Sequence, residues 1–353
     1  MTLTFWYTRC PVPTALSIAL QTGALAAEFA DDRIDIRSLA SSTDAKVRQA
    51  HFEATAPNFF RHGGNGPPLV SRARGADLRV LGLSWNASYR PLLALPQSGI
   101  RSVANLKGRR LSIPRRRKDS VDFWYATALR GIAHALHSGG LTVNDVELVE
   151  VATDRTFIGD SRAQAKPGDS LWDARYMLGH QREEAFALVR GEIDALYSQG
   201  AMAAILESSL GATTVVDNGG VTPPYASNND APLVLSASGT LIDEHPDLVA
   251  RWVARVSDAA DWARKNELAA KTIIASETGL AVELVDRAFS PRVHEELGVD
   301  LAADKVAALR SHHDHLVAIG QLAERLDFDT FVDPRPLALA REIRASRLER
   351  DAA

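Results

Sequence analysis

Residues 3–14 read LTFWYTRCPVPT, and this stretch sets the architecture of the chain. The apolar run Leu3–Tyr7 predicts a first β-strand, and Pro13 suits the first turn of a helix that Ala15–Ala26 can continue. Cys10 then lies in a strand-to-helix turn, near the positive end of a helix dipole. This position suits a reactive thiol that faces an anion, whereas a buried apolar cysteine is the plainer interpretation.

Strand and helix patterns alternate from this turn onward, which predicts an α/β architecture with mostly parallel sheets covered by helices. We expect strands over residues 3–7, 34–39, 78–83, 110–113, 146–151, 193–197, 213–216 and 233–237. We expect helices over residues 14–29, 68–74, 121–137, 182–190 and 201–210. From His245 onward the pattern is almost entirely helical and predicts a helical C-terminal block on the first lobe.

Two long stretches, Ala40–Gly66 and Thr153–Gly179, show no regular periodicity. Segments of this length without secondary structure are usually functional in a compact domain. We therefore interpret the first stretch, which contains His51 and Arg61, as a wall of a site, and the second stretch as a lid.

Length and composition predict a globular protein of two lobes, because 353 residues exceed one ordinary domain. A net charge of −4 disfavours a nucleic-acid partner, and no apolar run approaches the ~20 residues that cross a membrane. The first residues lack the pattern of a secretory signal, and one cysteine cannot form an intramolecular disulfide. We therefore expect a cytoplasmic monomer without a membrane partner.

Three segments in the middle of the chain resemble those of periplasmic-binding-protein-like folds. They are LKGRRLSI at residues 106–113, LTVNDVELV at 141–149 and RGEIDALY at 190–197. The resemblance implies a two-lobed type II fold of the α/β class, with a ligand cleft between the lobes and a helical C-terminal block. We place lobe I at residues 1–92 and 228–353, and lobe II at 93–227. Such a fold specifies no activity by itself.

The N-terminal region is similar to a narrower family, the aromatic sulfinate desulfinases. The resemblance covers nearly the whole chain and is most specific in the segments that hold Cys10, His51 and Arg61. Its motifs are CPVPxAL at residues 10–16, His51-Phe52, Pro57, Arg61-x-Gly63-Gly64, Pro67-Pro68-Leu69 and DALYS at 194–198. It implies cofactor-independent hydrolysis of the aryl carbon–sulfur bond of 2'-hydroxybiphenyl-2-sulfinate to 2-hydroxybiphenyl and sulfite, the last step of dibenzothiophene desulfurization.

The family pattern also implies roles for single residues. Cys10 would be the essential thiol, His51 its neighbour, Arg61 the sulfinate clamp and Gly64 a backbone donor to a sulfinate oxygen. Trp124 resembles an aromatic residue that lines the family's apolar pocket, with core packing as the alternative.

Three features depart from the family pattern. Thr8 stands where the family enzyme carries serine, so it keeps a hydroxyl beside the thiol segment. The basic run 115–118 has no counterpart, and we interpret it as a solvated loop. The stretch 153–179 aligns poorly, so no lid contacts are transferred from the family.

The chemistry of an aryl sulfinate suits these residue types. A planar guanidinium can hold both sulfinate oxygens, and Gly63-Gly64 permits close backbone approach and a positive φ. Cys10 could protonate the ring carbon as a general acid, or its thiolate could attack sulfur and form a covalent intermediate. Repulsion between two anions favours the first route. His51 could set the protonation state of Cys10 or orient it.

Two other functions share the fold. A solute-binding protein for an organic sulfonate or sulfinate is the main alternative, and turnover distinguishes it from an enzyme. A thiamine pyrimidine-precursor synthase needs a cysteine-rich iron motif, which a chain with one cysteine lacks. The cluster SHHDH at residues 311–315 fans around a predicted helix, and no phosphate-binding glycine loop occurs. We therefore expect no metal, no cofactor and a small-molecule partner only.

Overall fold

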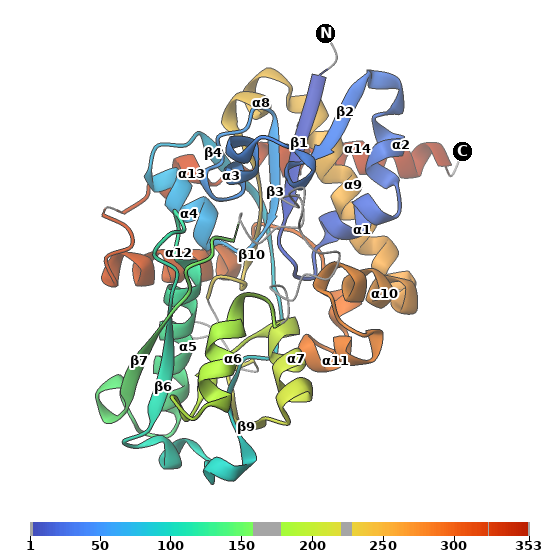
Figure 1. Ribbon diagram of the computed structural model, residues 1–353. Coiled ribbons are helices and arrows are strands. Elements are labelled where there is room, and N and C mark those ends of the chain that lie inside the picture. The colour runs from blue at the N-terminus through green and yellow to red at the C-terminus, as the bar shows by residue number, and fades with distance from the viewer. Residues whose placement is uncertain (1–2, 158–177, 220–227, 324, 352–353) are drawn as a thin grey trace. The chain divides into compact units, whose positions relative to one another are not determined.

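The structure is a computed structural model that describes residues 3–157, 178–219, 228–323 and 325–351. The chain forms two compact units (Figure 1). Unit 1 comprises residues 1–86, 229–282 and 291–353, and unit 2 comprises 87–228 and 283–290. The lobes expected from the sequence were 1–92 with 228–353, and 93–227. In the structure the short segment 283–290 also belongs to unit 2.

Unit 1 is built on a five-stranded sheet with the strand order β2-β1-β3-β10-β4. The strands are β1 (Leu3–Arg9), β2 (Ile34–Ser38), β3 (Phe59–Gly63), β4 (Leu78–Ser84) and β10 (Leu233–Ser238). Strand β1 is parallel to β2 and β3, but β10 is antiparallel to β3 and β4. The expectation of mostly parallel sheets is therefore wrong here, because the direction of a strand depends on its connections and not on its own residues.

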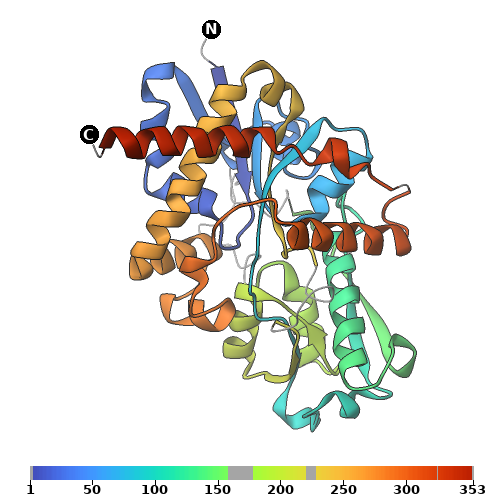
Figure 2. The same ribbon diagram turned by 180° about the vertical axis from the view of Figure 1, so that it is seen from behind.

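One face of this sheet packs against helices α1 (Ala15–Gln21) and α9 (Pro246–Lys265). At the centre of this core the ring of Phe60 stacks on Trp252 with centroids 4.1 Å apart, and Phe5 meets both rings edge-on. Helix α14 (Arg335–Asp351) crosses α9 on the outside (Figure 2). The predicted helical C-terminal block is confirmed, and all of it except residues 283–290 belongs to unit 1.

The helix predicted over residues 14–29 is interrupted. Thr14 caps α1 by accepting a hydrogen bond from the Ser17 amide at 3.1 Å, and α1 ends at Gln21. Gly23 then adopts a positive φ of 75° before helix α2 (Ala24–Glu28) begins. A glycine reaches this left-handed conformation at little steric cost, so the chain turns there.

The stretch expected to be irregular between residues 40 and 66 contains two regular elements, so that expectation is wrong. Helix α3 (Ala45–Glu53) begins after Asp44, whose carboxylate accepts from the Lys46 amide at 2.8 Å. It is followed by β3, which reads FFRHG and is buried at every position. The polar residues in a fully buried strand hide its hydrophobic pattern, because the usual alternation is missing.

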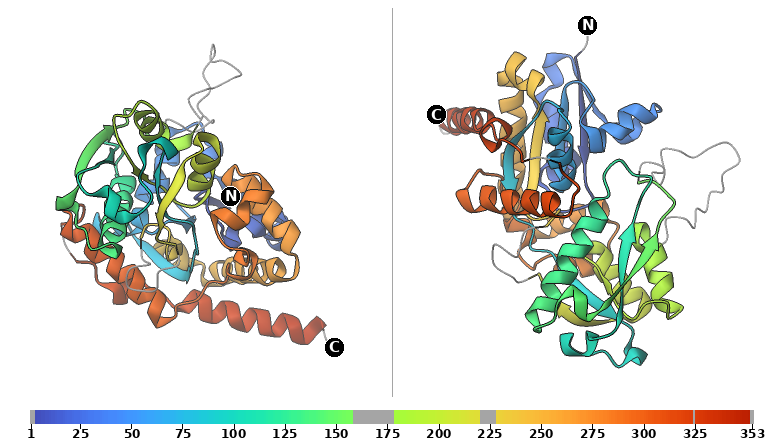
Figure 3. Two further views of the ribbon diagram at one scale, coloured as in Figure 1. Left: turned by 90° about the horizontal axis from the view of Figure 1, so that it is seen from below. Right: turned by 90° about the vertical axis from the view of Figure 1, so that its left-hand side faces the viewer.

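Unit 2 has a parallel pair, β6 (Arg110–Arg115) with β7 (Glu147–Ala152), and an antiparallel set in the order β8-β5-β9. The latter strands are β5 (Pro91–Ala94), β8 (Leu196–Tyr197) and β9 (Thr213–Asp217). Helix α5 (Phe123–Ser138) runs beside β6 (Figure 3). The other helices of this unit are α6 (Arg182–Val189), α7 (Gly200–Leu210) and α11 (Val285–Ala288).

The basic run 115–118 is not a solvated loop throughout. Arg116 is 1% exposed, its Nε donates to Asp119 at 2.8 Å, and its Nη2 donates to the Arg155 carbonyl at 2.8 Å. Its guanidinium also lies 3.8 Å from the centre of the Phe157 ring. A buried cation needs such partners, and the acid three residues further on supplies the main one.

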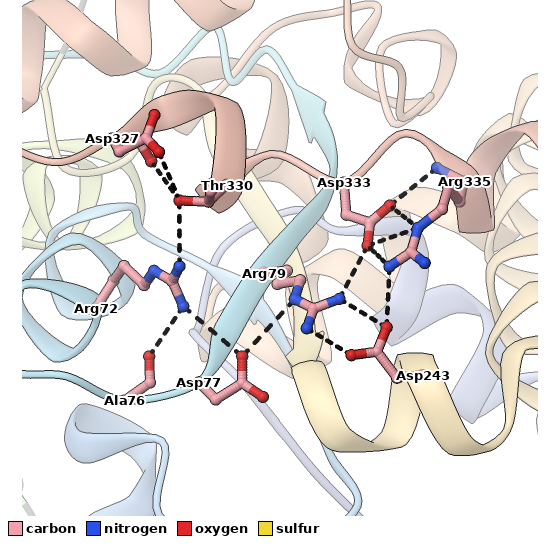
Figure 4. A network of polar contacts seen from close by, with 9 residues as sticks. All are labelled: Arg72, Ala76, Asp77, Arg79, Asp243, Asp327, Thr330, Asp333 and Arg335. Atoms are coloured by element: carbon pink, nitrogen blue, oxygen red, sulfur yellow. Dashed lines mark hydrogen bonds and ion pairs between the residues drawn. The ribbon is translucent and has the colours of Figure 1, made fainter.

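An ion-pair network holds the C-terminal segment against the sheet of unit 1 (Figure 4). Arg79 on β4 binds Asp243 at 2.6 Å and Asp333 at 3.4 Å. Arg335 binds the same two carboxylates, at 3.0 and 2.6 Å. Hydrogen bonds from both arginines lower the pKa of Asp243 to about 2. The start of α14 is thereby tied both to β4 and to helix α8 (Gly239–Glu244).

Four further α-helices complete the described part of unit 1: α4 (Gly66–Ala73), α10 (Glu267–Thr278), α12 (Ala303–Ala318) and α13 (Phe328–Phe331). Among the described residues no helix combines the length and apolar character needed to span a bilayer. The lid predicted over residues 153–179 lies outside the described residues, apart from its ends at 153–157 and 178–179.

Candidate active site

Cys10 lies in the turn between β1 and α1, where the sequence predicts it. Its amide donates to the His62 carbonyl on β3 at 3.2 Å, and its carbonyl accepts from the Val12 amide at 2.8 Å. These bonds hold the turn against the end of the neighbouring strand. The residue as a whole is partly exposed.

Arg61 reaches the sulfur from the adjacent strand. Thr8 and Arg61 are directly paired across β1 and β3, so both side chains lie on the sheet face opposite α9. Arg61 is 1% exposed. Its Nη2 donates to Cys10 Sγ at 3.4 Å, and its Nη1 donates to the Gly64 carbonyl at 2.6 Å. Its Nε donates to the His51 carbonyl at 3.3 Å, so three contacts fix the guanidinium.

Helix α3 covers this face of the sheet and brings His51 to the thiol. His51 Nε2 lies 3.9 Å from Cys10 Sγ, and Nδ1 lies 2.8 Å from the Thr8 hydroxyl. Burial, together with the positive charge of Arg61, lowers the pKa of His51 to about 3. The imidazole is therefore neutral at pH 7.

A neutral imidazole in this position can serve the thiol in two ways. If the Thr8 hydroxyl donates to Nδ1, then Nε2 carries the proton of His51 and points it at the sulfur. If Nδ1 donates to the Thr8 hydroxyl, then Nε2 accepts a hydrogen bond from the thiol of Cys10. In both tautomers the hydroxyl orients the ring, so Thr8 joins the site through His51.

Thr8→Val tests this orienting role, because valine keeps the shape of threonine and removes the hydroxyl. We expect kcat for sulfinate cleavage to fall about tenfold, as for other residues that orient a functional imidazole. Thr8→Ser keeps the hydroxyl and should stay within about twofold of the unchanged protein. Steady-state kinetics on the three proteins provides the measurement, and a valine variant at full rate would remove Thr8 from the site.

Steric contacts explain the glycine pair after Arg61. A methyl group at Gly63 would come within 2.4 Å of Cys10 Sγ, and one at Gly64 would come within 2.5 Å of Asn229 Nδ2. Neither glycine has a positive φ, so close approach and not backbone handedness requires them. The carbonyl of Gly64 binds Arg61, while the role of its amide as a donor to substrate stays a prediction.

Two buried polar residues beside the site gave no signal in the sequence. Ser236 pairs with Arg61 across β3 and β10, and its buried hydroxyl has no hydrogen-bond partner among the described residues. His62 follows Arg61 on β3 and faces the opposite side of the sheet. Neither of its ring nitrogens has a partner within the described part of the chain. Burial and the Arg61 charge lower the pKa of His62 to about 3.

The two neutral histidines predict that stability falls in mild acid. His51 and His62 have folded pKa values of about 3 against a reference of 6.5. Between these values the unfolded chain binds more protons, so the free energy of unfolding drops as pH falls from 6.5 toward 3. Urea unfolding at several pH values measures this drop. His62→Leu should reduce the slope by about one proton.

Trp124 belongs to unit 2 and not to the unit that carries the thiol. It is 1% exposed on α5, and its indole Nε1 donates to the buried Glu184 carboxylate at 2.9 Å. Its ring also meets His180 edge-on with centroids 4.7 Å apart. A role for Trp124 in a substrate pocket stays a prediction. Unit 1 by itself thus brings together the other predicted residues, which are Thr8, Cys10, His51, Arg61 and Gly64.

Within the described ranges no group of three or more His, Cys, Asp or Glu residues is arranged to hold a metal ion. In the histidine cluster on α12, His312 and His313 are buried, at 1% and 2% exposure. His313 Nε2 accepts from the Leu326 amide at 3.1 Å, so this ring has a structural partner.

Comparison with known proteins confirms the resemblance that the motifs predict. No family model matches the chain. The chain is 29% identical over 355 aligned residues to the 2'-hydroxybiphenyl-2-sulfinate desulfinase of Rhodococcus erythropolis, covering 94% of this chain and 92% of that protein. The enzyme of the same name from Rhodococcus qingshengii matches equally well.

Solved structures agree with this relationship. A cysteine-to-serine variant of the desulfurization enzyme DszB, in complex with biphenyl-2-sulfinic acid, is similar with a TM-score of 0.78 and 27% identity. That comparison covers 97% of this chain and 99% of the other. The periplasmic aliphatic sulphonate-binding protein SsuA of Escherichia coli has a TM-score of 0.63 at 15% identity, covering 94% and 91% of the chains. Such a likeness shows the fold alone, and the predicted periplasmic-binding-protein-like fold is confirmed.

Proposed function

We propose that this chain is an aromatic sulfinate desulfinase that cleaves the carbon–sulfur bond of 2'-hydroxybiphenyl-2-sulfinate. The observation that carries the proposal is the convergence of a thiol, an imidazole and a guanidinium from three separate elements. Sγ of Cys10 lies 3.4 Å from Arg61 Nη2 and 3.9 Å from His51 Nε2. The similarity to desulfinases of that name over 94% of the chain supports the assignment.

Arg61 can bind the sulfinate and keep its present contacts. A guanidinium has five N–H groups, and three of those of Arg61 donate to Gly64, His51 and Cys10. One N–H group on each Nη nitrogen is left, and such a pair can hold two oxygens of one anion. The clamp thereby places the sulfur atom of the substrate next to the sulfur of Cys10.

We propose the general-acid route, because charge repulsion opposes the attack of a thiolate on an anionic sulfinate. The thiol of Cys10 transfers its proton to the ring carbon, the carbon–sulfur bond breaks, and sulfur dioxide leaves. Water adds to sulfur dioxide to give bisulfite, and the proton released in that step returns to the thiolate. Arg61 stabilises the transient negative charge on Sγ. His51, whose pKa is about 3, is neutral at pH 7 and so leaves the thiol as the acid.

Sulfite release by the purified protein tests the function. With 2'-hydroxybiphenyl-2-sulfinate and no added metal or cofactor, we expect sulfite and 2-hydroxybiphenyl in equal amounts. Binding of the sulfinate without either product would favour the alternative, a solute-binding protein, which the fold of the sulfonate-binding proteins supports. The hydrolytic class, the place in dibenzothiophene degradation, the cytoplasmic location and the monomeric state stay predictions of the sequence.

A further inference from the structure

Asn229 lies in the loop before β10 and binds the turn that follows β3. Its backbone carbonyl accepts from the Asn65 amide at 2.6 Å, and its side-chain Oδ1 accepts from the Gly66 amide at 2.9 Å. These are two adjacent amides at the entrance of helix α4 (Gly66–Ala73). Asn229 is 7% exposed and Asn65 is fully buried, so water does not replace these bonds easily.

The same side chain packs against Gly64. A methyl group built on Gly64 would lie 2.5 Å from Nδ2 and 2.8 Å from Oδ1 of Asn229, so the amide plane occupies that space. A second bond braces the turn, because Asn65 Nδ2 donates to the Pro232 carbonyl at 2.9 Å. The peptide between Arg61 and α4 is therefore held on two sides by residues 229–232.

The contact of Asn229 with Gly64 reaches Arg61, the proposed sulfinate clamp, through one backbone carbonyl. The Gly64 oxygen accepts from Arg61 Nη1 at 2.6 Å, the shortest of the three contacts of that guanidinium. The direction of this carbonyl depends on the position of the peptide bond between Gly64 and Asn65. Asn229 fixes that peptide bond, because its backbone carbonyl accepts from the Asn65 amide and its side chain packs against Gly64. A shift of about 1 Å in a positioning group can cost a large factor in rate or binding.

We infer that Asn229 is a positioning residue that holds the guanidinium of Arg61 ready for an anion. The inference rests on the proposed function for the identity of that anion, a sulfinate. That Asn229 holds the Arg61 side chain in one position before any ligand binds does not depend on that function. Asn229 acts through Gly64 and Arg61 and touches neither the thiol nor the reacting carbon.

The first test uses the ligand-free protein. The Arg61 Nε–H resonance, assigned by its loss in Arg61→Lys, should exchange with solvent about tenfold faster in Asn229→Ala than in the unchanged protein. Asn229→Asp keeps an acceptor for the Gly66 amide and the shape beside Gly64, so it should retain slow exchange. Slow exchange in Asn229→Ala would overturn the inference, and Asn229→Ser provides the same comparison if the alanine variant does not fold.

The second test measures binding of biphenyl-2-sulfinate to proteins that also carry Cys10→Ser and so do not turn over. Asn229→Ala should raise Kd about tenfold, and this factor should fall below about twofold when Arg61→Lys is present. Asn266→Ala is the matched control, because Asn266 Nδ2 donates to the Trp262 carbonyl at 2.8 Å between α9 and α10. It should leave Kd unchanged.

These outcomes separate the inference from the proposed function. Equal loss of binding with and without Arg61→Lys would show that Asn229 acts as a general structural residue, which contradicts the inference. A protein in which Arg61 is ordered by Asn229 but which releases no sulfite would contradict the desulfinase assignment alone.

Discussion

Cys10→Ser is expected to abolish sulfite release, with a loss of at least about 1,000-fold in kcat. A serine hydroxyl is a far weaker acid than a thiol and a weaker nucleophile, so it can serve neither proposed route. The fold should persist, because serine is smaller and its oxygen can still accept from Arg61 Nη2, which now lies 3.4 Å from Sγ. Sulfite release and thermal unfolding on both proteins measure the effect.

A chemical control follows from the single cysteine in the chain. One equivalent of a thiol-alkylating reagent should modify Cys10 alone and inactivate the enzyme in step with labelling. Binding of biphenyl-2-sulfinate beforehand should slow both processes, because a ligand bound to Arg61 would lie beside the sulfur of Cys10, 3.4 Å from Arg61 Nη2. A serine variant that releases sulfite at the unchanged rate would remove the thiol from the mechanism.

Arg61→Lys should weaken binding of the sulfinate about 10- to 100-fold and lower kcat/KM by a similar factor. A lysine ammonium has three donors at one point and cannot span Gly64, His51 and Cys10 while also holding two oxygens. The side chain is 1% exposed, so the backbone carbonyls it leaves behind lose their partners as well. Calorimetry with the Cys10→Ser protein measures the affinity.

Arg48→Lys is the matched control for that substitution. Arg48 lies on α3, the helix that carries His51, and is also buried, at 7% exposure. Its Nη1 donates to the Ser42 carbonyl at 2.6 Å. The change should lower the thermal midpoint slightly and leave the affinity for sulfinate unchanged. If Arg61→Lys binds as tightly as the unchanged protein, the clamp must be assigned to another group.

Local sequence signals were sufficient for the strand, the turn and the thiol. The run Leu3–Tyr7 and Pro13 act over a few residues, so they identified β1 and the start of α1 to within about two residues, although Pro13 lies just before the capping residue Thr14 and not in the first turn. The motif match selected a histidine and an arginine that the structure places beside Cys10, although α3 and β3 were not predicted. The hydrophobic pattern of β3 is weak because this strand buries Arg61 and His62 at positions that an apolar pair would normally occupy.

The neighbours of the clamp could not be found from the sequence. Asn229 lies 165 positions after Gly64, and Ser236 is opposite Arg61 only because β10 pairs with β3. The buried Arg116 likewise looked like a solvated cation until Phe157 and the carbonyl of Arg155 were placed around it. Long-range contacts of this kind leave no periodic pattern in the sequence around either residue.

By itself the sequence determined which reactive groups are present, that one thiol follows the first strand, and that the chain alternates strands and helices. It could do so because strand period, helix caps and motif spacing act between near neighbours. Only the tertiary structure decided that β1, α3 and β3 meet at one sulfur, and that Asn229 holds the turn beside it. Side-chain convergence depends on strand pairing and helix packing between distant segments, and those are set by the energy of the whole folded unit.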